Sequence, residues 1–270
     1  MRPSLFLCVT AALALPGCSQ NAPAPSDAPS ATSANPSPAA PPPPAPPAQA
    51  RSVSESNDLY EFAYAYPAQA AAVPALRDWL DKDLETTKQA LIADARKDKA
   101  EASKDGYPFH AWTASKEWKV VTDLPAWLSL STIVGSYSGG AHPNYVFEAM
   151  VWDKTAGRRM AAIDLFTSKA ALSAAIRKPF CDGLTKARMK KRGEEWPGDG
   201  IDDFTKCVDP MEQVVILGSA GHKGFDRVGF LIAPYNAGPY AEGDYEVTVP
   251  VTAQVIAAVK PEYRGAFTTS

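Results

Sequence analysis

Residues 19–50 consist almost entirely of proline, alanine and serine, and this composition limits where a folded domain can begin. Asp27 is the one charged residue of the stretch, and large apolar side chains that could form a core are missing from it. Proline-rich chains favour the polyproline II helix, which rises about 3.1 Å per residue. We therefore expect a semi-rigid, low-complexity spacer. Recognition of its proline runs by the groove of a partner is the alternative.

A short apolar run precedes this spacer. It extends from Leu5 to Leu13 behind a single positive residue, Arg2, and leads into the sequence Leu-Pro-Gly-Cys that ends at Cys18. This layout is typical of a bacterial lipoprotein signal peptide, because Gly17 is small enough for cleavage and the Cys18 thiol can accept a lipid. An ordinary secretory signal or a transmembrane helix is the alternative, but the run is much shorter than the roughly 20 residues that a span needs.

Lipid on Cys18 would hold the protein at the bacterial cell envelope. We expect residues 1–17 to be removed as the signal peptide and residues 18–52 to form a lipidated tether. Two or more acyl chains give stable attachment to a membrane, because each buried methylene contributes about 0.8 kcal/mol. Ser19, in place of an aspartate directly after the cysteine, favours the outer membrane, with the protein facing the periplasm.

The rest of the chain is long enough for one large domain or two small domains that pack together. We divide it into an N-terminal α+β subdomain, residues 53–160, and a C-terminal α+β subdomain, residues 161–270. A hydrophobic content of 46% supports a real core. The formal net charge is −3, and it becomes about −4 once Arg2 leaves with the signal peptide. This balance gives no electrostatic reason to expect nucleic acid as a partner.

Two cysteines remain in the predicted globular part, Cys181 and Cys207. In an oxidising compartment such a pair is most simply a disulfide. Closing a loop of this length stabilises the fold by about 3.5 kcal/mol in the chain-entropy model. Redox catalysis would favour a Cys-x-x-Cys motif, and a metal site would favour further His or Cys nearby. We therefore predict a structural disulfide, no metal site and no cofactor.

Hydrophobic periodicity predicts an α+β fold, in which helices pack on one face of an antiparallel sheet. Strands are expected over residues 59–66, 118–122, 127–137, 145–153, 158–160, 214–217, 225–232 and 245–249. Helices are expected from Pro74 to about Lys104, from Thr167 or Ser168 to the basic run 186–192 with a kink or break at Pro179, and over residues 252–259. The basic run should face solvent at the helix end, and binding of an acidic glycan or lipid headgroup is its functional alternative.

Two loop motifs go beyond composition. Tyr-Ser-Gly-Gly-Ala-His-Pro-Asn occupies residues 137–144 and is followed by Asp-Leu-Phe at 164–166, whereas Pro-Tyr-Asn-Ala-Gly-Pro occupies 234–239 and is followed by Glu-Val-Thr-Val-Pro at 246–250. These motifs resemble the extracytoplasmic domain family of unknown function that is found in the lysozyme-sensing anti-sigma factor and ahead of the catalytic domain in some peptidoglycan deacetylases. The resemblance covers about residues 53–263, and its first half is similar to a small companion domain of that family.

The resemblance implies binding without catalysis. No segment precedes the lipid anchor to hold a sigma factor and no deacetylase domain follows, so we expect a binding module alone, with lysozyme or peptidoglycan as the ligand. Local geometry offers a simpler explanation of the motifs, since glycine permits positive φ at turns and proline fixes the re-entry. If instead the loops present side chains to a ligand, the binding residues are Ser138, Gly139, Gly140, His142, Pro234, Tyr235, Asn236 and Gly238.

Catalysis is the competing hypothesis, in the form of a cell-wall hydrolase or deacetylase that uses His142. Ser136 or Ser138 could pair with His142, but the sequence around them is not Gly-x-Ser-x-Gly. The three histidines, His110, His142 and His222, are too widely separated to form a close zinc motif. We therefore predict that the protein is not an enzyme.

Overall fold

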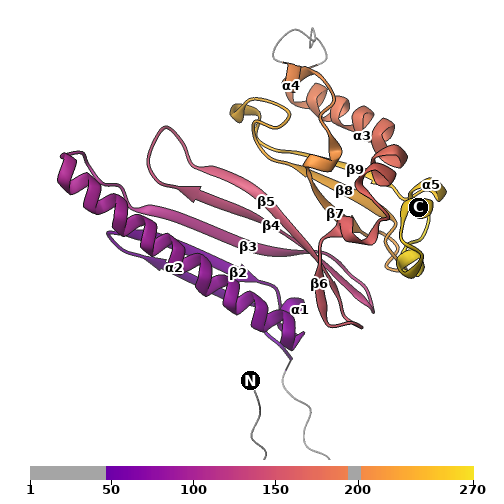
Figure 1. Cartoon of the computed structure of the whole chain (residues 1–270), viewed down its shortest axis with the longest axis horizontal. Coiled ribbons are helices and arrows are strands. Elements are labelled where there is room, and N and C mark those ends of the chain that lie inside the picture. Colours follow the sequence, from indigo (N-terminus) through magenta and orange to yellow (C-terminus); the bar gives the residue numbers. More distant parts are fainter. Residues whose placement is uncertain (1–46, 194–201) are drawn as a thin grey trace, which may run out of the picture. The chain divides into compact units, whose positions relative to one another are not determined.

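A six-stranded sheet forms the scaffold of the N-terminal half in the computed structural model, which describes residues 47–193 and 202–270 (Figure 1). The predicted signal peptide, the predicted lipidation site Cys18 and nearly all of the predicted tether lie outside these residues. The strands follow one another in chain order: β1 (Arg51–Ser56), β2 (Tyr60–Tyr66), β3 (Trp112–Asp123), β4 (Trp127–Tyr137), β5 (Asn144–Asp153) and β6 (Arg158–Met160).

Most neighbouring strands are antiparallel, but β2 and β3 pair in parallel. The long helix α2 (Pro74–Asp105) lies between these two strands in the chain and supplies the crossover that a parallel pair requires. The antiparallel prediction is wrong for this one pair. The edge strand β1 was not predicted, and it begins at Arg51, inside the segment that the sequence assigned to the tether.

The alternation predicted for residues 59–66 places the aromatic side chains of β2 against α2. Tyr64 and Phe62 are almost completely buried, while Glu61 faces solvent. The apolar stripe of α2 and the facing residues of β4 and β5 complete this core, with Leu76, Leu80, Leu84, Leu91, Leu128, Leu130, Met150 and Trp152. The helix ends at Gly106, whose φ of 76° is left-handed, as predicted from the glycine there.

The C-terminal half is built on a three-stranded antiparallel sheet of β7 (Val214–Gly218), β8 (Arg227–Ile232) and β9 (Tyr245–Pro250). Helix α3 (Lys169–Arg192) packs on it with the predicted inner stripe, Leu172, Ile176, Phe180 and Leu184, and the short helix α5 (Ala253–Ala258) contacts α3. Ser168 caps α3 by accepting a hydrogen bond from the Ala171 amide, 3.0 Å away. The helix continues past Pro179, so a break at that residue is ruled out.

The described residues therefore form an α+β fold, as predicted. Strand β7 contacts β3, β4 and β5, and Trp127 and Val151 from the first sheet enter the core beneath α3. The short helices α1 (Ala68–Ala71) and α4 (Asp202–Thr205) complete the α-helices of this part of the chain. In the same residues no helix combines the length and the apolar character that crossing a bilayer would require.

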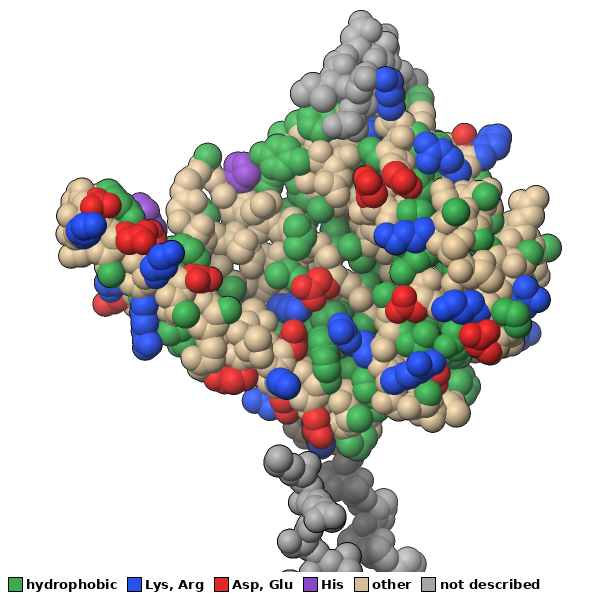
Figure 2. All heavy atoms as spheres, viewed as in Figure 1, with side chains coloured by type: hydrophobic (Ala, Val, Ile, Leu, Met, Phe, Trp, Pro, Cys, Tyr) green, Lys and Arg blue, Asp and Glu red, His purple; other side chains and the backbone are tan. Residues whose placement is uncertain are grey.

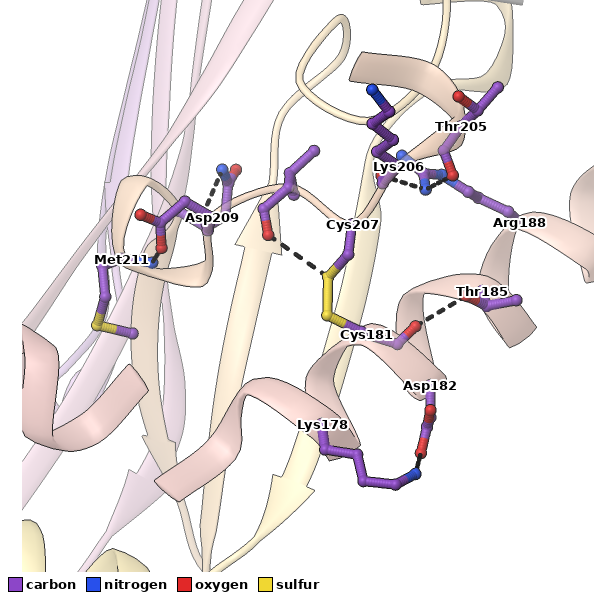
Figure 3. Close-up of a disulfide and its surroundings, with 12 residues drawn as sticks. Lys178, Cys181, Asp182, Thr185, Arg188, Thr205, Lys206, Cys207, Asp209 and Met211 are labelled. Carbon is purple, nitrogen blue, oxygen red and sulfur yellow. Dashed lines mark hydrogen bonds and ion pairs between the residues drawn. A yellow bond between two sulfur atoms is a disulfide. The ribbon is translucent and has the colours of Figure 1, made fainter. Parts of the chain in front are cut away.

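The predicted disulfide between Cys181 and Cys207 is confirmed (Figure 3). Cys181 lies on α3, and Cys207 lies on the segment that leads from α4 toward β7. The bond therefore fastens this segment to the helix.

Candidate functional site

The loop between β4 and β5 meets the loop between β8 and β9. His142 of the first loop places its Nε2 3.2 Å from the hydroxyl of Tyr235 in the second. The His142 ring also stacks on Tyr240, with the ring centroids 3.7 Å apart and the ring planes 16° apart. The Tyr240 hydroxyl donates to the carbonyl of Pro143, 2.6 Å away. The structure thus brings together the two loops that the sequence singled out.

His142, Tyr235 and Tyr240 form what we call the three-ring cluster. The centroid of Tyr235 lies 6.4 Å from that of His142 and 5.6 Å from that of Tyr240, and the ring planes differ by 31° and 34°. The His142 and Tyr240 rings are therefore stacked, and the Tyr235 ring is tilted against both. His142 and Tyr235 are exposed, and Tyr240 is half-buried, so the cluster presents aromatic surface to solvent.

Both ring nitrogens of His142 have partners. Nδ1 lies 2.8 Å from the Pro143 carbonyl, which can only accept, so Nδ1 carries the hydrogen in this contact. In the neutral ring, Nε2 then accepts from the Tyr235 hydroxyl. Ser138 is exposed in the same loop, and no hydrogen bond joins it to His142 in the described part of the chain. The histidine is thus held by a carbonyl and a phenol.

The turn residues of the first loop behave as the sequence predicted. Gly139 and Gly140 have φ values of 98° and 102°, a region that side chains with a Cβ rarely enter. The Tyr137 hydroxyl donates to the Gly140 carbonyl at 3.0 Å and closes the loop over these glycines. Their place in the motif follows from this turn.

In the second loop the left-handed residue is Tyr235, with a φ of 71°. The Tyr235 amide donates to the Gly238 carbonyl, and the Asn236 amide donates to the Ala233 carbonyl, at 3.1 and 3.2 Å. Such a conformation costs about 1–3 kcal/mol for a residue other than glycine and persists where the surroundings impose it. Here it turns the tyrosine outward, with 51% of its surface exposed, whereas Pro234 and Gly238 are buried below it.

The sequence missed the charged network that holds this second loop. The guanidinium of Arg192 donates to both carboxylate oxygens of Glu242, at 2.7 and 2.8 Å, and the hydroxyl of Tyr245 donates to the same carboxylate. Arg188 is 4% exposed and donates to the carbonyl of Ala237 at 3.0 Å. The prediction of a solvated basic run is therefore wrong for these two arginines.

The network perturbs the acidity of its members. Burial acts to raise the pKa of Glu242, but the hydrogen bonds from Arg192 and Tyr245 outweigh it, so the pKa is lowered below its usual value. Burial and the hydrogen bond to Glu242 raise the pKa of Tyr245 to about 12. The ion pair is thus charged at neutral pH, and it fixes the turn Tyr240–Glu242 to the end of α3.

Gly238 lies against this ion pair, and replacing it with alanine is expected to disturb the loop. A Cβ at position 238 would come within 2.2 Å of a Glu242 carboxylate oxygen and 3.0 Å of an Arg192 nitrogen. Because such overpacking typically costs about 1–3 kcal/mol, Gly238→Ala should lower the free energy of unfolding by that amount in urea denaturation. Gly265→Ala is the matched control, since a Cβ there would meet nothing within 4 Å. Equal stability of the two variants would contradict the prediction.

A metal site was also considered in the sequence analysis. In residues 47–193 and 202–270, no group of three or more His, Cys, Asp or Glu side chains is arranged to hold a metal ion. His142 is the one histidine that the structure places in the three-ring cluster.

Comparison with known proteins bears on the N-terminal half first. Residues 53–145 match the family model described as "Deacetylase PdaC". For this part of the chain the resemblance inferred from the sequence is confirmed. No curated protein has a significantly similar sequence.

Two solved structures are similar over most of the chain. A member of the DUF3298 family from Bacteroides fragilis has a TM-score of 0.53 and 15% sequence identity, with 81% of this chain and 95% of that chain covered. A DUF3298 family protein from Pseudomonas aeruginosa has a TM-score of 0.49 and 15% identity, with 80% and 96% covered. At this identity, the likeness to the Bacteroides protein shows a shared fold.

Proposed function

We propose that the protein is a non-catalytic, lipid-anchored protein of the bacterial cell envelope, and that the three-ring cluster binds the glycan of the cell wall. The observation that carries this proposal is the grouping of three aromatic rings, His142, Tyr235 and Tyr240, with His142 and Tyr235 exposed. Aromatic rings with polar tips offer an apolar face for a sugar ring and hydrogen-bonding groups for its hydroxyls.

The way in which the cluster is held supports binding. Tyr235 keeps an unfavourable backbone conformation that turns its ring outward, and strained residues of this kind gather at ligand sites. The Arg192–Glu242 ion pair fixes the loop between β8 and β9 to the end of α3. A site built on such a support loses less conformational entropy when the ligand arrives.

The partners of His142 favour binding over a hydrolase or deacetylase. A general base needs one ring nitrogen directed at the reacting proton, and a second group usually orients the other nitrogen. In this protein the two nitrogens are directed at the Pro143 carbonyl and the Tyr235 hydroxyl. On the face shown in Figure 2, acidic and basic side chains are interspersed.

Retention on purified peptidoglycan sacculi tests the proposal. The full chain in mild detergent should sediment with sacculi and leave them undigested. Tyr235→Ala should weaken retention roughly thirtyfold, because truncating a central aromatic contact costs about 2 kcal/mol. Tyr107→Ala is the control, since Tyr107 is also an exposed tyrosine, 44% exposed, and lies beyond the end of α2.

Other outcomes would overturn the proposal. Digestion of the sacculi that His142→Ala abolishes would show catalysis. Capture of lysozyme with no retention on sacculi would show that the ligand is a protein. Equal retention of Tyr235→Ala and Tyr107→Ala would show that the three-ring cluster is not the binding surface.

A further inference from the structure

Two hollows lie beside the loops that carry the three-ring cluster. The first has a volume of about 560 Å³, and Tyr235 and Asn236 form part of its wall. The second has a volume of about 310 Å³, and its wall includes Pro143, whose carbonyl accepts hydrogen bonds from His142 and Tyr240. The two hollows have no lining residue in common. The contacts of His142 with Tyr235 and with Pro143 therefore run from the wall of one depression to the wall of the other.

Side chains with hydroxyl or amide groups share the wall of the second hollow with apolar residues such as Ile133. Thr113, Ser115 and Ser136 contribute hydroxyls, and Asn144 contributes an amide. Its one acidic side chain, Asp244, accepts a hydrogen bond from the Tyr145 hydroxyl at 2.8 Å. The hydroxyl and amide groups of this wall both donate and accept hydrogen bonds and are uncharged, which matches a ligand rich in hydroxyls.

The first hollow is also polar. The amide of Asn236 donates to the amide oxygen of Gln213 at 3.2 Å, and both residues line the hollow. The carboxylate of Asp209 accepts from the Met211 amide at 2.9 Å, and Glu212 and Lys206 add one charge of each sign. A deep apolar pocket of the kind that anchors a hydrophobic peptide side chain would need a different lining.

From this arrangement we infer that the ligand is a linear, uncharged oligosaccharide that lies across the three rings and reaches into both hollows, so that a disaccharide fills only part of the site. The inference rests on the proposed function and adds the length of the ligand and the residues that contact its two ends. His142 and Tyr240 are stacked face to face, so a sugar ring would pack on the outer side of this stack or on Tyr235. Gln213 would contact one end of the ligand and Asn144 the other.

Calorimetric titration of the full chain with oligomers of N-acetylglucosamine tests this inference. The affinity should rise at least about tenfold between the disaccharide and the hexasaccharide, because added hydrogen bonds at each end contribute about 1 kcal/mol or more. Gln213→Ala and Asn144→Ala should each remove part of this gain. Gln89→Ala, which removes an exposed amide from α2, should change neither affinity.

The outcomes separate this inference from the proposed function. Equal affinity for the disaccharide and the hexasaccharide would overturn the inference and leave glycan binding intact. A length dependence that neither Gln213→Ala nor Asn144→Ala alters would overturn the assignment of the two hollows. Failure to bind any of these saccharides or sacculi would overturn both proposals, and binding that requires the peptide stems of the cell wall would overturn the inference of an uncharged oligosaccharide.

Discussion

Replacing Cys181 by serine is expected to lower the free energy of unfolding by about 3.5 kcal/mol. The disulfide to Cys207 spans a sequence separation of 26 residues, and without it the unfolded chain gains the conformational entropy of an open loop. Urea denaturation of the oxidised protein and of Cys181→Ser, monitored by tryptophan fluorescence, measures the difference. For a domain of this size, such a loss is a large part of the total stability.

Two controls check that the loss comes from the cross-link. Cys207→Ser and the double variant should be destabilised by the same amount as Cys181→Ser, because each of them opens the same loop. Reduction of the wild-type protein should reproduce the effect. A wild-type protein that unfolds at the same urea concentration with and without reductant would contradict the prediction.

Without the disulfide, hydrogen bonds should still hold the segment that contains Cys207 to α3. Arg188 donates to the carbonyls of Thr205 and Lys206 at 3.2 and 2.7 Å (Figure 3). Arg192 donates to the carbonyl of Phe204 at 2.8 Å. These bonds hold the same segment to α3 without a covalent link. The disulfide therefore contributes mainly through the unfolded state, and the arginines contribute through the folded one.

The elements that could be predicted are those whose signal is local. The alternation of aromatic residues in β2 and the bounds of β4 follow from neighbouring side chains alone. Helix α2 begins at a proline and ends at a left-handed glycine, as its sequence indicated. In each case, one short stretch contains both the propensity and the pattern of burial.

Pairing between distant strands could not be predicted in the same way. The edge strand β1 has the sequence Arg-Ser-Val-Ser-Glu-Ser, and only one of its residues is a large apolar one, so its pattern is that of a loop. Antiparallel pairing with β2 makes this segment a strand. The parallel pairing of β2 with β3 depends on where α2 returns the chain, which no local pattern records.

The basic run at the end of α3 contains two arginines whose spacing, unlike their charge, is that of buried residues. Arg188 and Arg192 continue, at intervals of four residues, the buried stripe that includes Phe180 and Leu184. The spacing therefore indicated that these two side chains point into the core, whereas their charge suggested that they face solvent. The buried carbonyls and the carboxylate of Glu242, distant in sequence, satisfy the two guanidinium groups.

The candidate site was predicted only in part, because some of its contacts join residues that are distant in the sequence. His142 and Tyr235 stood out because they lie in glycine-containing turn motifs. Tyr240 lies just outside the second motif, in a short helical turn, and its role comes from stacking on a ring nearly a hundred residues away in the chain. Contacts of this kind exist only after the two halves fold together.

Replacing Lys116 by methionine is the second change with a large expected effect, and it should lower the free energy of unfolding by about 3 kcal/mol. The Lys116 ammonium lies 2.9 Å from a carboxylate oxygen of Asp83 on α2 and 2.8 Å from one of Glu148 on β5. The lysine side chain is only 6% exposed. The expected loss is at the low end for a broken buried ion pair, because 47% of the Glu148 side chain is exposed and water screens that charge.

The loss of stability in Lys116→Met arises mainly at Asp83. Its carboxylate also accepts a hydrogen bond from Tyr64 at 2.7 Å, and the Tyr64 hydroxyl accepts one from the Trp118 indole at 3.1 Å, so the charge lies at the head of a buried polar chain. Without the lysine this charge loses its cation but keeps its hydrogen-bond donor. Adding Asp83→Asn to Lys116→Met should therefore recover part of the lost stability, because the amide removes the uncompensated charge and can still accept from Tyr64.

The same strand offers a control for this cycle. Lys119 lies in β3, is 67% exposed, and pairs with Glu117 at 3.6 Å, so Lys119→Met should change the free energy of unfolding by less than about 0.5 kcal/mol. Urea denaturation of Lys116→Met, of Asp83→Asn and of the variant that combines them gives the coupling energy. Equal effects of Lys116→Met and Lys119→Met would show that the buried ammonium contributes nothing beyond a surface charge, because both changes remove one lysine from the same strand and differ in burial and partners.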